Sequence, residues 1–389
     1  PKSSETKKVN LDFNKEFINT FTENIERGNV EFINQTLKDL HEADVANLIE
    51  NLTPDTRTKL IEIELFNIDP EIFIELNESI QSEVLQLLSI ESLIKIIKRL
   101  ESDNAIKILE NLSKETKEKV LEKLPPKDKF LLQEGLSYPE DSAARIMQRE
   151  FTAVPSNWTV GQTIDYLRED KDLPEEFLEI FIVDNDFKPI GTVPSSRVLR
   201  TSRDLKMSSI MREMPVLISV NMDKEEVGLT FENYNLVSAG VVNKENKLVG
   251  MITADDVVTV VQEEAEEDAL RLAGVGDEEI TDSVMLKTKR RFNWLLLNLF
   301  TALLATWVIS FFGASIEQMV ALAFLMPIVA SMGGNAGMQT LAVTIRAIAT
   351  KELSKSNFNR VVGKEFLIGI LNGIIFAVSY THLTLPTTD

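Results

Sequence analysis

The sequence has no cysteine and only two histidines, His41 and His382, among 389 residues. Disulfide bonds, thiolate metal sites and cysteine nucleophiles are therefore excluded, and zinc or copper sites are not expected. Basic residues are also scarce: 41 lysines and arginines face 61 acids, which gives a net charge of −20. A nucleic-acid partner is therefore not expected, because phosphate binding needs a basic face. Any bound metal would be held by oxygen, which suits magnesium, calcium or manganese.

Long apolar runs are missing from the first 290 residues and dominate residues 292–378. We therefore expect a polar part followed by a membrane part. No secretory signal precedes the polar part, so we expect it to remain in the cytosol. No combination of nucleophile, base and orienting group stands out in the chain, so an enzyme is not expected.

Residues 11–138 are predicted to form an all-α domain. Apolar residues recur at helical spacing, as in Ile106, Leu109 and Leu112, and turn or cap signals such as Pro125-Pro126 separate the runs. Similar helix pairs in succession indicate a superhelical arrangement. We expect His41, in this region, to lie on a helix surface rather than on a metal.

Residues 139–261 contain an internal duplication. Two short β-rich hairpins carry Gly191 and Gly250, which are 59 residues apart, and the Ile-Met pairs that precede the two copies are 64 residues apart. A repeat of about 60 residues is the simplest explanation. Strands alternating with helices predict two α/β modules.

Residues 262–282 hold nine acids and one base. Like charges four residues apart destabilise an isolated helix, so this clustering is consistent with bound cations, although a solvated acidic face explains it as well. The sign then reverses at a basic collar, which ends this connecting segment near residue 290; the bases are Lys287, Lys289, Arg290 and Arg291. Basic flanks stay cytoplasmic, so the domains before the collar are predicted to be cytoplasmic.

The apolar part is predicted to contain two full spans, at 292–312 and 319–345. A third apolar run, Phe366 to Val378, has only 13 residues, which is too short to cross because about 20 residues are needed. In the second span Ser331, Asn335 and Gln339 are four residues apart and share one helix face. They suit the lining of a pore for a hydrated cation, and equally suit hydrogen bonds between packed helices. The residues expected to permit close helix packing or to weaken the helix are Pro327, Gly333, Gly334 and Gly337.

The duplication resembles a tandem pair of CBS domains, and its second copy carries the typical ending Gly250-Met251-Ile252-Thr253-Ala254-Asp255-Asp256. The segment Met326 to Leu353 and the junction Tyr138 to Asp141 resemble the MgtE family of magnesium transporters. This resemblance implies a homodimer with an axial pore and an acidic plug helix. The sensor acids that it implies are Glu91, Glu225, Asp256, Glu264, Glu267 and Asp268. The resemblance also implies a nucleotide site at Thr253 and Asp255 of the second copy. The first copy lacks the corresponding acid.

The chain departs from the family in two respects. Lys95, Asn235 and Thr259 stand where the family's sensor can carry acids, which implies fewer, weaker or relocated ions. Residues 379–389 resemble no family segment and fit no membrane helix, so we expect them to be non-native and the later spans, with their selectivity acid, to be absent.

The resulting prediction is a multidomain protein. Its parts are an all-α superhelical N-terminal domain (11–138), an α/β tandem CBS pair (139–261), an acidic connecting helix with basic collar (262–290) and an incomplete α-helical transmembrane domain (291–378). The predicted function is passive inward Mg²⁺ flux through a multi-pass protein of the cell membrane, gated by cytosolic Mg²⁺. The alternatives are a CBS-regulated transporter of Mn²⁺ or Co²⁺, and a membrane-tethered module that binds ATP or another adenosine nucleotide. The expected partners are divalent cations, the lipid bilayer and a second copy of the chain.

Overall fold

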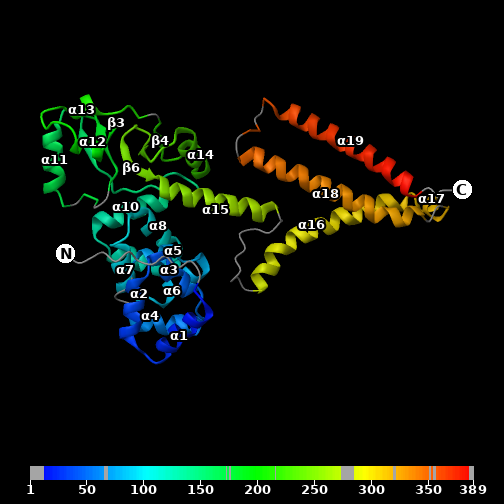
Figure 1. Ribbon diagram of the computed structural model, residues 1–389, viewed down its shortest axis with the longest axis horizontal. Helices are drawn as coiled ribbons and strands as arrows, with labels where there is room; N and C mark the ends of the chain where they lie inside the picture. Colours follow the sequence, from blue (N-terminus) through cyan, green and yellow to red (C-terminus); the bar gives the residue numbers. More distant parts are fainter. Residues whose placement is uncertain are drawn as a thin grey trace. The chain divides into compact units, whose positions relative to one another are not determined.

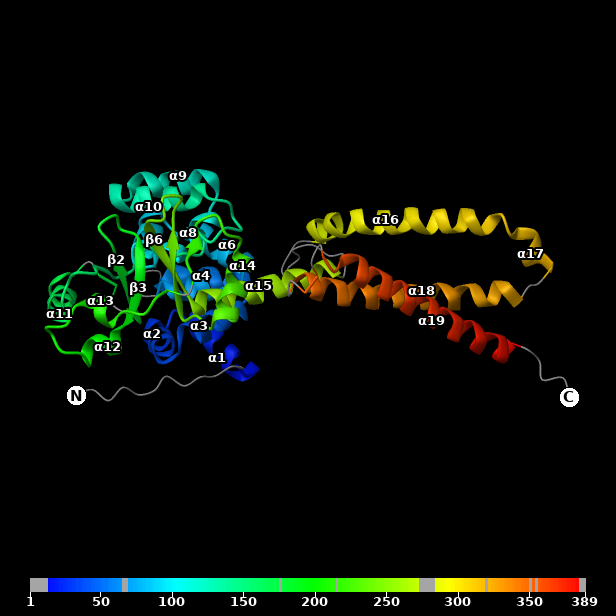
Figure 2. The same ribbon diagram turned by 90° about the horizontal axis from the view of Figure 1, so that it is seen from above.

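The computed structural model describes residues 13–64, 69–171, 173–174, 177–214, 216–272, 284–318, 321–349, 352–353 and 356–384. The chain divides into two compact units, Pro1–Gln262 and Glu263–Asp389 (Figures 1 and 2). The architecture confirms the predicted succession of an N-terminal helical domain, a CBS pair and a C-terminal helical region.

The first unit begins with ten short helices, drawn from blue to cyan in Figure 1. They are α1 (Lys15–Glu26), α2 (Val30–Asp39), α3 (Glu42–Glu50), α4 (Pro54–Glu64), α5 (Glu71–Glu75), α6 (Glu78–Leu87), α7 (Ile90–Ile97), α8 (Ser102–Glu110), α9 (Lys114–Lys123) and α10 (Pro126–Ser137). Contacts join α1 to α4, α3 to α5, α7 to α9 and α8 to α10. One continuous apolar core, with Phe21, Leu60 and Leu109 completely buried, runs through the domain. His41 is exposed at the start of α3, where its Nδ1 accepts a hydrogen bond from the Ala43 amide and caps the helix.

Two three-stranded sheets follow, and their topologies are identical. The first copy contains β1 (Ala153–Pro155), α11 (Val160–Glu169), β2 (Glu179–Val183), β3 (Pro189–Pro194), α12 (Ser195–Leu199) and α13 (Met207–Ile210). The second contains β4 (Ile218–Ser219), α14 (Lys224–Tyr234), β5 (Ser238–Val242), β6 (Leu248–Thr253) and the start of α15 (Ala254–Leu272). In each copy the first strand is parallel to the second, and the second is antiparallel to the third.

The two copies exchange their leading segments. Met147, which precedes the first copy, is buried in the core of the second, and its backbone neighbour Gln148 pairs with Met251 of β6. Met211, which precedes the second copy, packs against the core of the first. The two glycines of the repeat lie at these crossings. A Cβ on Gly250 would lie 2.8 Å from the Gln148 carbonyl oxygen, and one on Gly191 would lie 2.6 Å from the Arg212 carbonyl oxygen. The duplication is confirmed, and the exchange explains why each Ile-Met pair lies so far upstream of its matching hairpin.

The second unit contains the remainder of α15 and four helices: α16 (Val284–Ser310), α17 (Gly313–Gln318), α18 (Ala321–Ala349) and α19 (Phe358–Thr384). Short α17 lies where the chain turns between α16 and α18 (Figure 2). Within the described residues, length and composition select Lys287–Ser310 and Phe358–Ser379 as candidate membrane spans. Helix α18 is not among them, so the second expected span stays a prediction.

One sequence expectation about the end of the chain was wrong. The apolar run Phe366–Val378 lies within the longer helix α19, which also includes the polar residues on both sides of the run. The candidate span has 22 residues and is long enough to cross. Residues 379–384 continue α19, but the candidate span ends at Ser379 and residues 385–389 lie outside the described residues, so the expectation that 379–389 fit no membrane helix stays a prediction.

Candidate functional site

Three carboxyl groups meet where the helical domain contacts the CBS pair. Glu101 and Asp103 lie at the start of α8, and Asp256 lies in the first turn of α15. The side chain of Gln148 joins the two domains here: its Nε2 donates to Glu101 Oε2 at 2.8 Å and to Asp256 Oδ2 at 3.2 Å. Thr253 donates to the same oxygen of Asp256 at 2.6 Å. We call Glu101, Asp103 and Asp256 the carboxyl cluster.

If all three groups were ionised, the carboxyl cluster would hold more negative charge than its neighbours compensate. Asp103 is only 8% exposed, and its Oδ1 is buried without a hydrogen-bond partner. Burial and the nearby Asp256 raise the pKa of Asp103 well above its ordinary value. Burial also raises the pKa of Asp256, although the hydrogen bond from Thr253 opposes the shift. A buried carboxylate oxygen without a donor is costly, so this site favours a proton or a cation.

Glu101 forms the outer side of the carboxyl cluster. Burial, followed by repulsion from Glu150 and Asp256, raises its pKa to about 7. The residue nevertheless keeps an exposed surface, so solvent screens part of this effect. The carboxyl cluster is thus buried on the Asp103 side and reaches solvent on the Glu101 side, from which an ion can approach.

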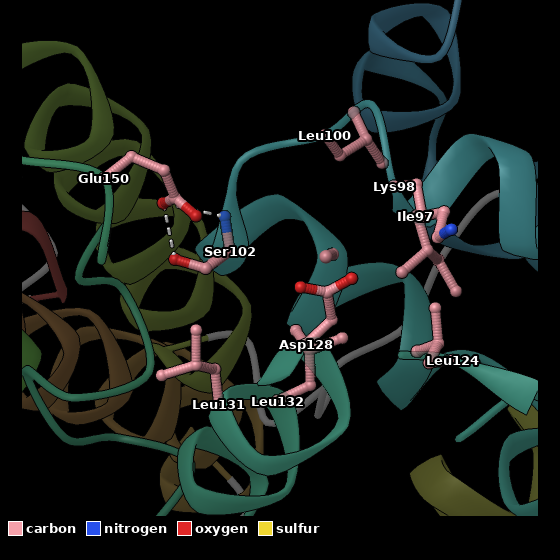
Figure 3. Close-up of a pocket in the computed structure, with 10 residues that line it drawn as sticks. Ile97, Lys98, Leu100, Ser102, Leu124, Asp128, Leu131, Leu132 and Glu150 are labelled. Carbon is pink, nitrogen blue, oxygen red and sulfur yellow. Dashed lines mark hydrogen bonds between the residues drawn. The ribbon is translucent and has the colours of Figure 1, made fainter. Parts of the chain in front are cut away.

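The chain segment 145–150, which we call the junction loop, anchors the helical domain beside the carboxyl cluster. Glu150 Oε2 accepts hydrogen bonds from the Ser102 amide at 3.2 Å and the Ser102 hydroxyl at 2.8 Å (Figure 3). Arg149 forms an ion pair with Glu134 of α10 at 2.8 Å, and Arg145 forms one with Glu110 of α8. Glu150 therefore caps α8 from outside the helical domain.

Ser102 and Glu150 also line a small cavity of about 120 Å³ (Figure 3). Its walls are mainly apolar, with Leu124, Leu131 and Leu132 among the lining residues, and Asp128 and Lys98 also line it. In the wall of this cavity, the Glu150 carboxylate is hydrogen-bonded to Ser102. The cavity thus differs in chemistry from the carboxyl cluster.

The donor chemistry of the carboxyl cluster suits a hard divalent ion, since only oxygen atoms are offered and one buried oxygen lacks a partner. The oxygens are not already gathered around one point: the described residues contain no ready group of three metal-ligating side chains. An ion bound here would be held by Glu101, Asp103 and Asp256 after a local rearrangement, or with water completing its shell.

Only one of the six acids predicted as sensors, Asp256, belongs to the carboxyl cluster. Glu91 lies on the surface of α7 and forms an ion pair with Lys123 at 2.8 Å, and the hydrogen bond from Lys123 lowers its pKa. Glu225 is exposed in the first turn of α14. The other three, Glu264, Glu267 and Asp268, lie on α15 beyond Gln262, where the first unit ends, and Glu267 pairs with Arg271.

The predicted nucleotide residues and the departures from the family have local explanations. The Thr253 hydroxyl is bonded to Asp256, whereas Asp255 is exposed. Asn235 ends α14 in the left-handed conformation, at φ 49° and ψ 50°, which asparagine adopts more readily than most residues. Lys95 is exposed on α7, and Thr259 bonds back to the Asp255 carbonyl.

The polar residues Ser331, Asn335 and Gln339 lie on α18, and all three are exposed. Pro327 lies inside this continuous helix, so it does not break it. A Cβ on Gly333, Gly334 or Gly337 would meet no atom within 4 Å. Their proposed roles in lining and packing therefore remain predictions that require a partner surface.

Sequence reasoning missed Glu101, Asp103, Gln148 and Glu150. Acids at the start of a helix are commonly explained by their interaction with the helix dipole, so the positions of Glu101 and Asp103 did not indicate a binding site. The one available signal was the polar run Gln148-Arg149-Glu150 directly after the buried Met147.

Three family models match the chain in succession. The MgtE intracellular N domain matches residues 40–141, the CBS domain matches 143–204 and 207–263, and a model described as divalent cation transporter matches 326–387. The last match includes most of the segment 379–389, which corrects the expectation that this segment resembles no part of the family.

Curated relatives and solved structures agree with these matches. Proteins named magnesium transporter MgtE from Bacillus subtilis and Thermus thermophilus are 32% and 30% identical over 244 and 240 residues, which are 62% and 61% of this chain and 54% and 53% of theirs. The chain thus spans about half the length of these relatives. The fold resembles the soluble part of a magnesium transporter (TM-score 0.56, 22% identity, 64% of this chain and 99% of that one). It also resembles the cytosolic domain of the Mg²⁺ channel MgtE in complex with ATP (TM-score 0.58, 24% identity, 62% and 99%).

The helical domain, the CBS pair and the matched C-terminal helices define the class: a CBS-containing protein of the divalent cation transporter type. Within that class, the chain resembles the MgtE family, whose N domain it carries ahead of the CBS pair.

Proposed function

We propose that this protein transports Mg²⁺ across the cell membrane and that Mg²⁺ binding on the cytosolic side closes it. The observation that carries the proposal is the carboxyl cluster, which joins the helical domain to the CBS pair and includes a buried oxygen without a partner. The order of family matches supports the transport function.

The gating follows from electrostatics. Without an ion, charge on Glu101, Asp103 and Asp256 opposes contact between the two domains. A bound Mg²⁺ neutralises this charge and favours the docked arrangement, since a ligand stabilises the state that binds it better. The acids on α15 and the surface acids Glu91 and Glu225 would add weaker sites of the same kind.

The permeation path would use α18. Ser331, Asn335 and Gln339 offer neutral oxygens at four-residue spacing, which suits an ion that keeps much of its water. The membrane potential supplies about 2.3 kcal/mol per charge per 100 mV, so a divalent ion gains about twice that on moving inward. We propose a multi-pass homodimer in which the basic collar, including Lys287 and Lys289, keeps the N-terminal domains cytoplasmic.

Flux in liposomes tests the transport function. The full chain is reconstituted around a trapped Mg²⁺ indicator, and we expect entry that Mn²⁺ or Co²⁺ reduces if these ions share the path. Asn335→Ala should lower the rate, whereas Gln133→Ala, at an exposed position on α10, should not. No entry above protein-free liposomes with any of these ions would refute transport, and entry of Mn²⁺ or Co²⁺ without Mg²⁺ would establish the alternative cation.

A protease-protection assay tests the sensing function separately. We expect segment 13–272 of the reconstituted chain to resist cleavage more strongly in millimolar Mg²⁺ than in chelator. Equal cleavage under both conditions would remove the sensing claim and leave transport standing.

Nucleotide binding is a second proposal, because a structure with the same fold is described in complex with ATP. Thr253 and Asp255 are the candidate contacts. Titration of the full chain with ATP, compared with Asp255→Ala, tests it: absence of a binding signal in the unsubstituted chain would exclude nucleotide binding, and equal binding in both proteins would exclude Asp255 as a contact.

A further inference from the structure

Gln148 occupies an unusual position, because its amide nitrogen lies between two carboxyl groups of the carboxyl cluster. It donates to Glu101 Oε2 at 2.8 Å and to Asp256 Oδ2 at 3.2 Å. The residue is only 5% exposed. Carboxylates only accept hydrogen bonds, so an amide nitrogen there satisfies both, whereas the amide oxygen would satisfy neither.

The backbone of Gln148 is fixed independently of its side chain. Its amide donates to the Met251 carbonyl at 2.8 Å, and its carbonyl accepts from the Met251 amide at 2.8 Å. This pairing holds the junction loop against β6 whether or not the side chain keeps its contacts. The side chain can therefore leave the carboxyl cluster without disrupting the exchange between the two CBS copies.

The third member of the carboxyl cluster is left out of this arrangement. Asp103 forms a side-chain hydrogen bond with Asp256 but none with Gln148, and its Oδ1 is buried and has no hydrogen-bond partner. One neutral amide can supply two hydrogen bonds, and both are used by Glu101 and Asp256. Gln148 thus joins the two domains without neutralising any charge.

We infer that Gln148 is a built-in competitor of the divalent ion: its amide holds Glu101 and Asp256 together in the ion-free docked state and must leave when an ion bridges them. This inference rests on the proposed sensing function and adds its regulation. The amide occupies Glu101 Oε2 and Asp256 Oδ2, and an ion that bridges the two carboxyl groups through these oxygens takes its place. Gln148 therefore keeps some of the protein docked at low ion concentration and raises the concentration at which the ion takes over.

The competition predicts that one substitution weakens docking and at the same time strengthens ion binding. Replacing Gln148 by methionine keeps the length and approximate volume of the side chain but removes both donors. The ion-free protein should dock less firmly, because no amide then joins Glu101 to Asp256, although the contacts of Arg145, Arg149 and Glu150 with the helical domain remain. The ion should nevertheless bind at a lower concentration, because no amide has to be displaced.

We expect Gln148→Met to weaken protease protection in chelator and to lower the half-saturating Mg²⁺ concentration, measured by calorimetry on the full chain, by about threefold to tenfold, as the loss of one or two hydrogen bonds to charged groups allows. Gln133→Met, an exposed position on α10, should change neither quantity.

The opposite role gives the opposite sign. If Gln148 were structural glue that persists in the ion-bound state, Gln148→Met would destabilise docking with and without the ion, and the half-saturating concentration would rise. A rise or no change overturns the inference while the wild-type response still supports the sensing function. Absence of any wild-type Mg²⁺ response would overturn both.

Discussion

At the scale of single residues, Glu101 shows how the carboxyl cluster couples stability to pH. Its pKa of about 7 lies above the ordinary value of 4.5, mainly because of burial, and the neighbouring acids Glu150, Asp256, Glu71 and Asp255 act in the same direction. In the pH range between these values the folded state binds more protons than the unfolded state. The free energy of unfolding contributed by Glu101 therefore falls as pH rises from about 4.5 to about 7.

Glu101→Gln should remove this dependence. An uncharged amide imitates the protonated acid, so we expect the variant to unfold at a higher temperature than wild type at about pH 8 and at nearly the same temperature at about pH 4.5. Thermal unfolding followed by circular dichroism across this range measures the difference. Glu91→Gln gives a control of opposite sign, because the hydrogen bond from Lys123 lowers the pKa of Glu91. Identical pH profiles for wild type and Glu101→Gln would contradict the explanation.

At the scale of elements, α8 depends on the junction loop for its N-terminal cap. The Glu101 side chain forms no cap hydrogen bond, and Glu150 accepts from the Ser102 amide instead. Glu150→Ala should therefore destabilise the first turn of α8 by about 1 kcal/mol, and hydrogen exchange should report faster exchange at its first amides. Ser113→Ala, which removes a cap within the helical domain at α9, should accelerate exchange in α9 alone. Unchanged exchange in α8 would show that solvent replaces Glu150 without loss.

The repeated elements, namely the short helices and the two CBS copies, were the ones that could be predicted from the sequence. Apolar periodicity located the short helices, and the spacing of Gly191 and Gly250 located the two CBS copies. The carboxyl cluster was not predictable, because Glu101 and Asp256 are 155 residues apart and meet only after two domains dock. The length of helix α19 was underestimated for a different reason. Only its apolar run was counted, although the helix also includes the polar residues at both ends of that run.

At the scale of the whole molecule, the segment exchange makes the CBS pair a single cooperative body and also connects it to the carboxyl cluster. The crossing at Gly250 contacts Met147 and Gln148, whereas the crossing at Gly191 contacts Met211 and Arg212. Only the first crossing positions a residue that bonds to the carboxyl cluster. The two equivalent glycines should therefore differ in function while they resemble each other in stability.

Gly191→Ala and Gly250→Ala test this distinction. Each added methyl group would meet a backbone oxygen closer than 3 Å, so each variant should lose about 1–3 kcal/mol of unfolding free energy. Both variants should lower the thermal midpoint of the CBS pair, but only Gly250→Ala should shift the Mg²⁺ concentration that half-protects segment 13–272, since it displaces the backbone from which Gln148 reaches Glu101 and Asp256. An equal shift in both variants would mean that the Mg²⁺ response follows overall stability, and that the geometry at Gln148 has no separate part in it.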